Sequence, residues 1–269
     1  MADPLEVLDR STRCVLAFSG DRGPLVALMA FWSDGSSLWM STPAVSMKAA
    51  ALRRRAQCSV YVPPPDGGGA GIVLAGRARV YGLHDPLGLA VHGAVVSTAM
   101  TALAAGNAGT ILDYVQNARF VPNRFRPRNR VAVRFSIDES RPVRAPDPGP
   151  GVAPALPPVV PGDIRRAVTG QRRVVLATGL PSGTVSVTPA VWAAGFSLQL
   201  PRGDVLPAAG PATVYAGTDP RQRPIRVVGL SLMGELDGER LKPHRATWWE
   251  GCDLRTVDLP STSSVVIPE

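Results

Sequence analysis

Anion-binding residue types lie close together between residues 41 and 48. Ser41 and Thr42 end a run of strand composition, Ser46 stands where a helix cap is favoured, and Lys48 follows two residues later. The first amides of a helix attract anions, and hydroxyl groups add short hydrogen-bond donors. Lys48 is placed at the positive end of the helix dipole, an unfavourable position unless an anion binds there. A second interpretation is also open, in which Ser46 only caps the helix and Lys48 extends into solvent.

These residues must be positioned by the elements on either side of them. The apolar run 25–32 and the strand 37–42 are joined by the turn sequence SDGS at 33–36, which predicts an antiparallel hairpin. Residues 46–57 have helical composition, and 58–62 return to strand composition. Both faces of the run 25–32 are apolar, which predicts a strand buried on both sides.

The rest of the first half adds strands and two helical segments. Strand composition recurs at 14–19, 72–83 and 130–137, and helical composition is found at 87–106 and 110–119. The uncharged segment 87–106 is long enough to cross a bilayer, but Ala, Gly, Ser and Thr dominate it and weaken its apolar driving force. We therefore expect a helix of a soluble protein there.

A proline-rich segment divides the chain. Residues 145–161 hold seven prolines in seventeen positions, and proline interrupts both helices and sheets. The sequence predicts a first domain at 1–144, a linker at 145–161 and a second domain at 162–269.

The second half repeats the strand order of the first. Residues 173–178, 184–194 and 196–200 match the first three strands, which indicates a divergent internal repeat. Later strands are expected at 224–236 and 244–250. The segment 201–207 stands where the first half has its Lys-bearing helix, and its two prolines predict no helix there.

Composition limits the class of protein. Hydrophobic residues make up 45% and charged residues 19%, as in a globular protein, and the formal charge is +8. The basic residues occur in short groups with only 6% aromatic residues, so we expect no nucleic-acid partner, and no membrane partner either. Three widely spaced cysteines suit neither a disulfide framework nor a metal site, and the residues 1–13 do not resemble a signal peptide, so we predict a cytoplasmic protein.

Other candidate sites have weaker patterns. His84, His92 and His244 lack the spacing of a zinc site, so no metal is predicted, and His92 is either a haem ligand or a packed side chain. The glycine-rich loop 67–71 lacks the Lys-Ser/Thr of a phosphate-binding loop, and the chain has no Gly-x-Ser-x-Gly nucleophile motif. No catalytic residue can be named.

The pattern Thr42-x-x-x-Ser46-x-Lys48-x-x-x-Leu52, between a hairpin strand and a helix, resembles the phosphate-binding segment of the pyridoxamine 5'-phosphate oxidase-like family. The resemblance implies a split β-barrel that dimerises and binds a flavin between barrels. It implies that Ser41, Thr42 and Lys48 hold the cofactor phosphate, with Ser46 and Met47 beside them. It also implies that the strand carrying Ala27 and Met29 follows the flavin ring.

The sequence departs from the oxidases themselves at three positions. Val26, Phe31 and Met47 stand where those enzymes carry basic residues, so the chain does not resemble a pyridoxamine phosphate oxidase proper. Branches of the family that use a deazaflavin also resemble the segment, and their acidic cofactor would suit the arginines at 53–55. FMN and the deazaflavin coenzyme F420 both remain open as cofactors.

Together these observations predict a mainly β protein with some α structure (α+β). We expect two tandem FMN-binding-type split β-barrels that form a pseudo-dimer within one chain, and a homodimer of the whole chain is compatible with this. The resemblance implies a flavin- or deazaflavin-dependent oxidoreductase that transfers a hydride to or from a small-molecule substrate. The alternative is a non-catalytic protein that binds flavin, deazaflavin or haem.

Overall fold

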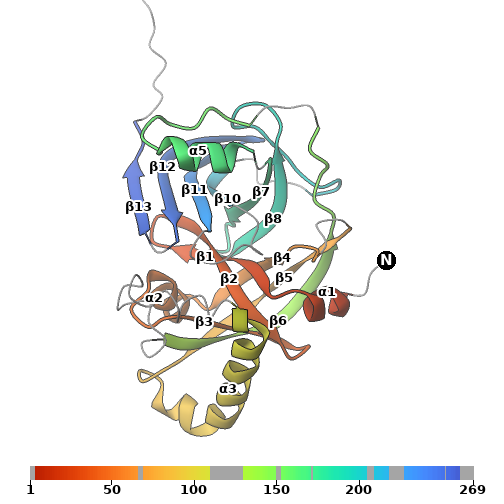
Figure 1. The fold of residues 1–269 in the computed structure, drawn as a ribbon, viewed down its shortest axis with the longest axis vertical. Coiled ribbons are helices and arrows are strands. Elements are labelled where there is room, and N and C mark those ends of the chain that lie inside the picture. Colours follow the sequence, from red (N-terminus) through yellow and green to blue (C-terminus); the bar gives the residue numbers. More distant parts are fainter. Residues whose placement is uncertain are drawn as a thin grey trace, which may run out of the picture.

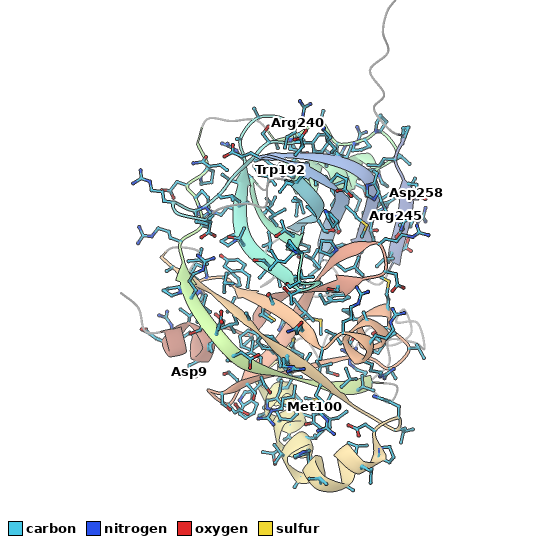
Figure 2. The ribbon with its side chains drawn as sticks, turned by 180° about the vertical axis from the view of Figure 1, so that it is seen from behind. Asp9, Met100, Trp192, Arg240, Arg245 and Asp258 are labelled. Carbon is cyan, nitrogen blue, oxygen red and sulfur yellow. The ribbon has the colours of Figure 1, made fainter. Side chains whose placement is uncertain are left out.

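The structure is a computed structural model that describes residues 4–65, 69–109, 130–149, 153–170, 172–204, 209–217, 227–251 and 253–260. Its strands form a closed barrel and a seven-stranded sheet that curls into a second barrel, one above the other in Figure 1, with helices packed against them. Figure 2 shows the same ribbon from behind with its side chains. The predicted helix at 110–119 lies outside the described residues.

The first barrel is a closed sheet of antiparallel strands in the order β1-β2-β3-β6-β5-β4. Its strands are β1 (Arg13–Gly20), β2 (Gly23–Ser33), β3 (Ser37–Pro43), β4 (Gln57–Val62), β5 (Gly71–Tyr81) and β6 (Arg130–Val143). Side chains such as Leu16, Phe18, Phe31 and Phe135 fill its interior. Its helices are α1 (Pro4–Arg10), α2 (Met47–Arg54) and α3 (Pro86–Gly106).

The second barrel repeats this plan after α5 (Gly162–Thr169). Its strands are β7 (Arg173–Gly179), β8 (Val185–Trp192), β9 (Leu198–Gln199), β10 (Ala209–Gly217), β11 (Val228–Asp237), β12 (Arg240–Glu250) and β13 (Asp253–Asp258). The sheet order is β13-β12-β11-β10-β7-β8-β9. A bridge between Ser197 and Arg240 joins the β9 end to β12, as β3 joins β6 in the first barrel. The predicted tandem split-barrel fold is confirmed.

The two barrels differ where the sequence indicated. The first has α2 between β3 and β4, whereas the described part of the connection between β9 and β10, residues 200–204, contains no helix. The first also has α3 between β5 and β6, whereas a tight turn at Gly238 and Glu239 joins β11 to β12. Strand β11 covers the predicted 224–236 segment from residue 228 onward and ends one residue later, at Asp237. Strand β12 begins earlier than predicted, and β13 was not predicted.

The barrels pack through the outer faces of β1, β2 and β4 against β7, β8 and β10. Two hydrogen bonds across this contact are equivalent under exchange of the barrels: Ser59 Oγ donates to Val185 O and Thr213 Oγ1 donates to Pro24 O, each at 2.6 Å. The first links a hydroxyl on β4 to the start of β8, and the second links a hydroxyl on β10 to the start of β2. The contact therefore has the approximate two-fold symmetry expected of a pseudo-dimer.

Helix α3 is held against the first barrel along one side only (Figure 1). Val96, Ala99 and Leu103 are buried on it, whereas Leu87 and Val91 are more than 70% exposed. By length and composition it is one helix among the described residues that could cross a membrane.

Candidate functional site

The predicted anion-binding segment lies at one end of the first barrel, where β3 passes into α2. Ser46 is the N-cap of α2, and its Oγ accepts a hydrogen bond from Ala49 N at 3.1 Å. The buried Thr42 places its Oγ1 3.1 Å from Ser46 Oγ. Ala49, Ala51 and Leu52 of α2 are buried, which fixes the helix on the barrel. The two hydroxyls are thus held together on a rigid turn.

Lys48 turns towards the barrel instead of extending into solvent. Its side chain is half-buried, and its Nζ lies 3.5 Å from the Met29 Sδ on β2. A thioether is a weak acceptor, and the described residues place no carboxylate within 4 Å of this amine. Burying a charge without an opposite charge is costly, so the site favours an anionic ligand.

Arg130 joins the site from the start of β6. Its Nε donates to Ser41 Oγ at 2.9 Å, and its Nη2 donates to the backbone carbonyl of Ser41 at 2.7 Å. Strand pairing places Arg130 opposite Pro43. Sequence analysis missed this residue as part of the site; the signal was the group of arginines near residue 130, but only the β3–β6 pairing brings one of them here.

The surroundings of Lys48 disfavour the positive charge of its amine. Burial, and after it the positive charge of Arg130, lower the pKa of Lys48 to about 8, against a smaller opposing effect of Cys14. Burial and a nearby like charge both disfavour the charged form of the amine. A bound anion would counter them and return the amine to its charged form.

The other predicted site residues have different surroundings. Met47 is 66% exposed, so its side chain is not part of the barrel core. Ala27 and Met29 direct their side chains into the first barrel, whereas Val26 and Leu28 on the same strand face the second barrel. The cofactor roles of Ala27 and Met29 stay predictions, with backbone groups of β2 as the available donors and acceptors.

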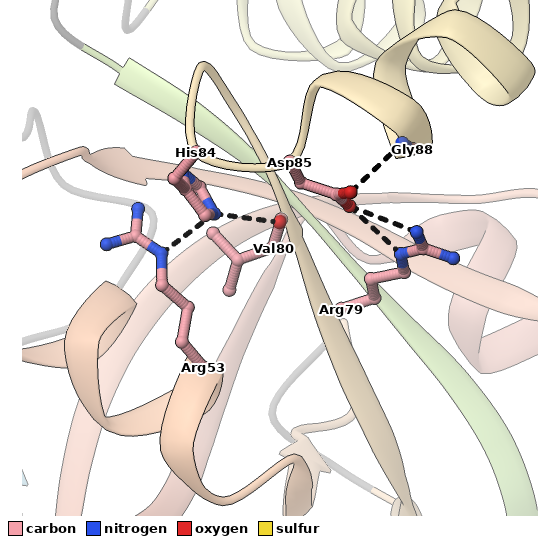
Figure 3. A network of polar contacts seen from close by, with 6 residues as sticks. All are labelled: Arg53, Arg79, Val80, His84, Asp85 and Gly88. Carbon is pink, nitrogen blue, oxygen red and sulfur yellow. Dashed lines mark hydrogen bonds and ion pairs between the residues drawn. The ribbon is translucent and has the colours of Figure 1, made fainter.

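A polar network behind α2 ties the helix to the barrel (Figure 3). Arg53 Nε donates to His84 Nε2 at 2.8 Å, and that nitrogen lies 3.2 Å from the carbonyl of Val80. Beside it, Arg79 binds Asp85, the N-cap of α3, whose Oδ1 accepts from Gly88 N. The network connects α2, β5 and α3, so His84 has a structural role here.

The remaining weak candidates are packed or isolated. The His92 ring meets the edge of Tyr81, with ring centroids 5.9 Å apart, and Trp249 stacks on Tyr215 at the contact between barrels. Within the described ranges, no group of three or more His, Cys, Asp or Glu side chains could hold a metal ion. Part of the glycine-rich loop 67–71 lies outside those ranges.

Comparisons with known proteins give similar folds and no sequence relative. No family model and no curated protein matches the chain. Similar solved structures include a putative pyridoxamine 5'-phosphate oxidase from Listeria innocua, which is 14% identical with a TM-score of 0.33. The match covers 51% of this chain and 93% of that oxidase. A FAD-binding protein from Mesorhizobium loti is 18% identical with a TM-score of 0.39, and the match covers 51% of this chain and 88% of that protein. An F420 reductase is 18% identical with a TM-score of 0.33, and the match covers 51% of this chain and 94% of the reductase.

The strand pairing defines the class of fold. The chain has a split β-barrel fold that is present twice, once before and once after α5. The resemblance suggested by residues 42–52 is confirmed at the level of fold.

Proposed function

We propose that this protein binds a flavin or deazaflavin through its phosphate and is an oxidoreductase acting on a small organic molecule. The observation that carries the proposal is the half-buried Lys48 amine without a carboxylate partner, set beside Arg130 and the hydroxyls of Ser41, Thr42 and Ser46. Charged hydrogen bonds from such groups are the usual means of holding a phosphate.

The donor set fits a phosphate monoester. The hydroxyls of Thr42 and Ser46 lie together at the N-terminus of α2, with Lys48 in the first turn of the helix, and Arg130 is bonded to Ser41 on the strand before it. Among the described residues, no carboxylate lies within 4 Å of the Lys48 amine. The bound group would supply the hydride chemistry, since flavins and deazaflavins carry it themselves. The chain would hold the phosphate, line the ring with β2 and the second barrel, and exclude water there.

FMN and coenzyme F420 are both candidates within this proposal. The missing basic residues at Val26, Phe31 and Met47 leave fewer phosphate contacts than an FMN oxidase has, which favours the deazaflavin. The similar solved structures include a FAD-binding protein and an F420 reductase.

A non-catalytic carrier is the second candidate. Its support is the shortage of acid–base groups among the described residues near the Lys48 amine. The charges that act on this amine are those of Arg130 and the Cys14 thiol, and burial raises the pKa of that thiol far above its usual range. Such a thiol is inert at neutral pH.

The proposal includes an organisation and a location for the chain. The domains would be residues 1–144 and 162–269, with one cofactor held at their contact because only the first has a Lys-bearing helix. The protein would act in the cytoplasm without nucleic acid or membrane.

The first test is the absorption spectrum of the purified protein, followed by titration with FMN, FAD, coenzyme F420 and haem. Binding of a flavin or deazaflavin that Lys48→Met weakens at least tenfold, and Lys242→Met leaves unchanged, supports the proposal. Turnover of reduced cofactor with candidate acceptors then separates an enzyme from a carrier. A protein that binds none of the four, or binds them equally after Lys48→Met, overturns the assignment.

A further inference from the structure

A hollow that contains two arginines lies beyond the C-terminal end of α2, where the first barrel meets the second. It has a volume of about 390 Å³ and is lined by Arg55, Ala56, Gln57, Arg77, Ser182 and Gly183. This volume falls within the roughly 300–1,000 Å³ of small-molecule sites. The first four residues belong to the α2–β4 junction and β5, and the last two to the turn between β7 and β8.

Among the described residues, the two arginines of the hollow differ from their neighbours because no ion pair or side-chain hydrogen bond is formed by either of them. Arg54 binds Asp21, Arg79 binds Asp85 and Arg53 donates to His84. For Arg55 and Arg77, the described structure contains no carboxylate within 4 Å and no side-chain hydrogen bond. Arg77 is paired with Gln57 across the β4–β5 ladder, and Gln57 lies two residues after Arg55. The pairing therefore places the two arginines close together at this end of the sheet.

The second barrel contributes a hydroxyl on a fixed turn. Ser182 Oγ lies 2.7 Å from Thr184 Oγ1, and Gly183 N donates to Leu180 O at 2.9 Å. Ser19 Oγ of the first barrel donates to Gly183 O at 3.0 Å, which fixes this turn against β1. Gly183 has φ +80°, a conformation that favours glycine.

We propose that this hollow binds a small, multiply charged phosphorylated ligand between the two barrels. Arg55 and Arg77 would neutralise its charge, and Ser182 would donate a hydrogen bond from the other barrel. A ligand there would bridge the barrels and strengthen their contact, so binding would stabilise the folded chain.

This site is separate from the one at Lys48. Seven residues of helix and cap separate Lys48 from Arg55, which corresponds to about 10 Å along the axis. The Lys48 amine is also directed to Met29 on β2, and Lys48 is not among the residues that line the hollow. The inference holds whether or not the Lys48 site binds a flavin.

The test is a calorimetric titration of the full chain with inorganic pyrophosphate at low salt, performed in the Lys48→Met background so that the first site does not contribute. We expect one pyrophosphate per chain. Arg55→Gln and Arg77→Gln should each weaken binding about tenfold, the usual effect of losing a charged hydrogen bond. The matched control is Arg54→Gln, on the same turn but paired with Asp21, which should change affinity less than twofold.

Three results would overturn the proposal. They are no binding in the Lys48→Met background, equal weakening by Arg54→Gln, and tighter binding of a DNA oligonucleotide that also depends on Arg54. Thermal unfolding of each variant without ligand shows whether it is folded, and Ser182→Ala tests the second barrel's contribution without altering the charge.

Discussion

Lys48 should cost this protein stability in the absence of a ligand. Its pKa falls from the ordinary 10.5 to about 8, which corresponds to ~3 kcal/mol against the charged amine. Because the side chain is only half-buried, we expect a part of this, about 1–2 kcal/mol, to be recovered in Lys48→Met. Methionine keeps an unbranched stem beside Met29 and removes the charge.

The expected result is a rise in melting temperature of about 2–5 °C at pH 7, together with loss of phosphate-dependent ligand binding. The sign follows from proton linkage. Below pH 8 the amine is charged in both states and the whole cost is present. Between pH 8 and 10.5 the folded state has released the proton while the unfolded state retains it, so the wild type gains stability as the pH rises. The advantage of Lys48→Met should therefore shrink across this range.

The sequence offers a matched control because it contains only two lysines. Lys242 is exposed and lies 2.7 Å from Asp237, so Lys242→Met should not stabilise the protein. Reductive methylation with a ¹³C label, followed by NMR titration, would report the pKa of each lysine directly. A Lys48 pKa near 10.5, or a lower melting temperature for Lys48→Met at pH 7, would refute the reasoning.

Three further outcomes follow from the same contacts. Arg130→Gln should raise the pKa of Lys48 in the same NMR titration and weaken phosphate-dependent binding about tenfold. An unchanged pKa of Lys48 would show that Arg130 is not part of the site. Affinity for a phosphate-bearing ligand should fall about tenfold between pH 7 and 9.5 as Lys48 loses its proton, and binding near pH 8 should take up a proton. Calorimetry in buffers of different ionisation enthalpy measures the proton uptake, and an affinity that does not change with pH would contradict the prediction. Ser59→Ala and Thr213→Val should each lower the free energy of unfolding by about 1–2 kcal/mol, since each leaves a buried carbonyl without its donor. Urea denaturation measures both, with Thr256→Val at an exposed hydroxyl of β13 as the control. A large effect of only one of the two substitutions would contradict the pseudo-symmetry.

The local order of elements could be predicted from the sequence because each signal lies within a few residues. Alternating and continuous apolar runs predicted β1 to β5, and the turn at 33–36 predicted the β2–β3 hairpin. The prolines at 201–207 predicted that no helix forms there, and the described part of that segment, residues 201–204, contains none. The cap at Ser46 was identified for the same reason, since its bond to Ala49 spans only three residues.

Long-range pairing and burial could be decided only by the tertiary structure. Arg130 reaches Ser41 across 89 positions because β3 and β6 are neighbours in a closed barrel, and no local pattern encodes that neighbour. Likewise the sequence shows a lysine in a first helical turn, but its direction towards Met29 depends on how α2 packs over the barrel. The hollow between Arg55, Arg77 and Ser182 requires both barrels to be in contact. Composition therefore determined which chemical groups this chain has, and packing determined which of them remain without a partner.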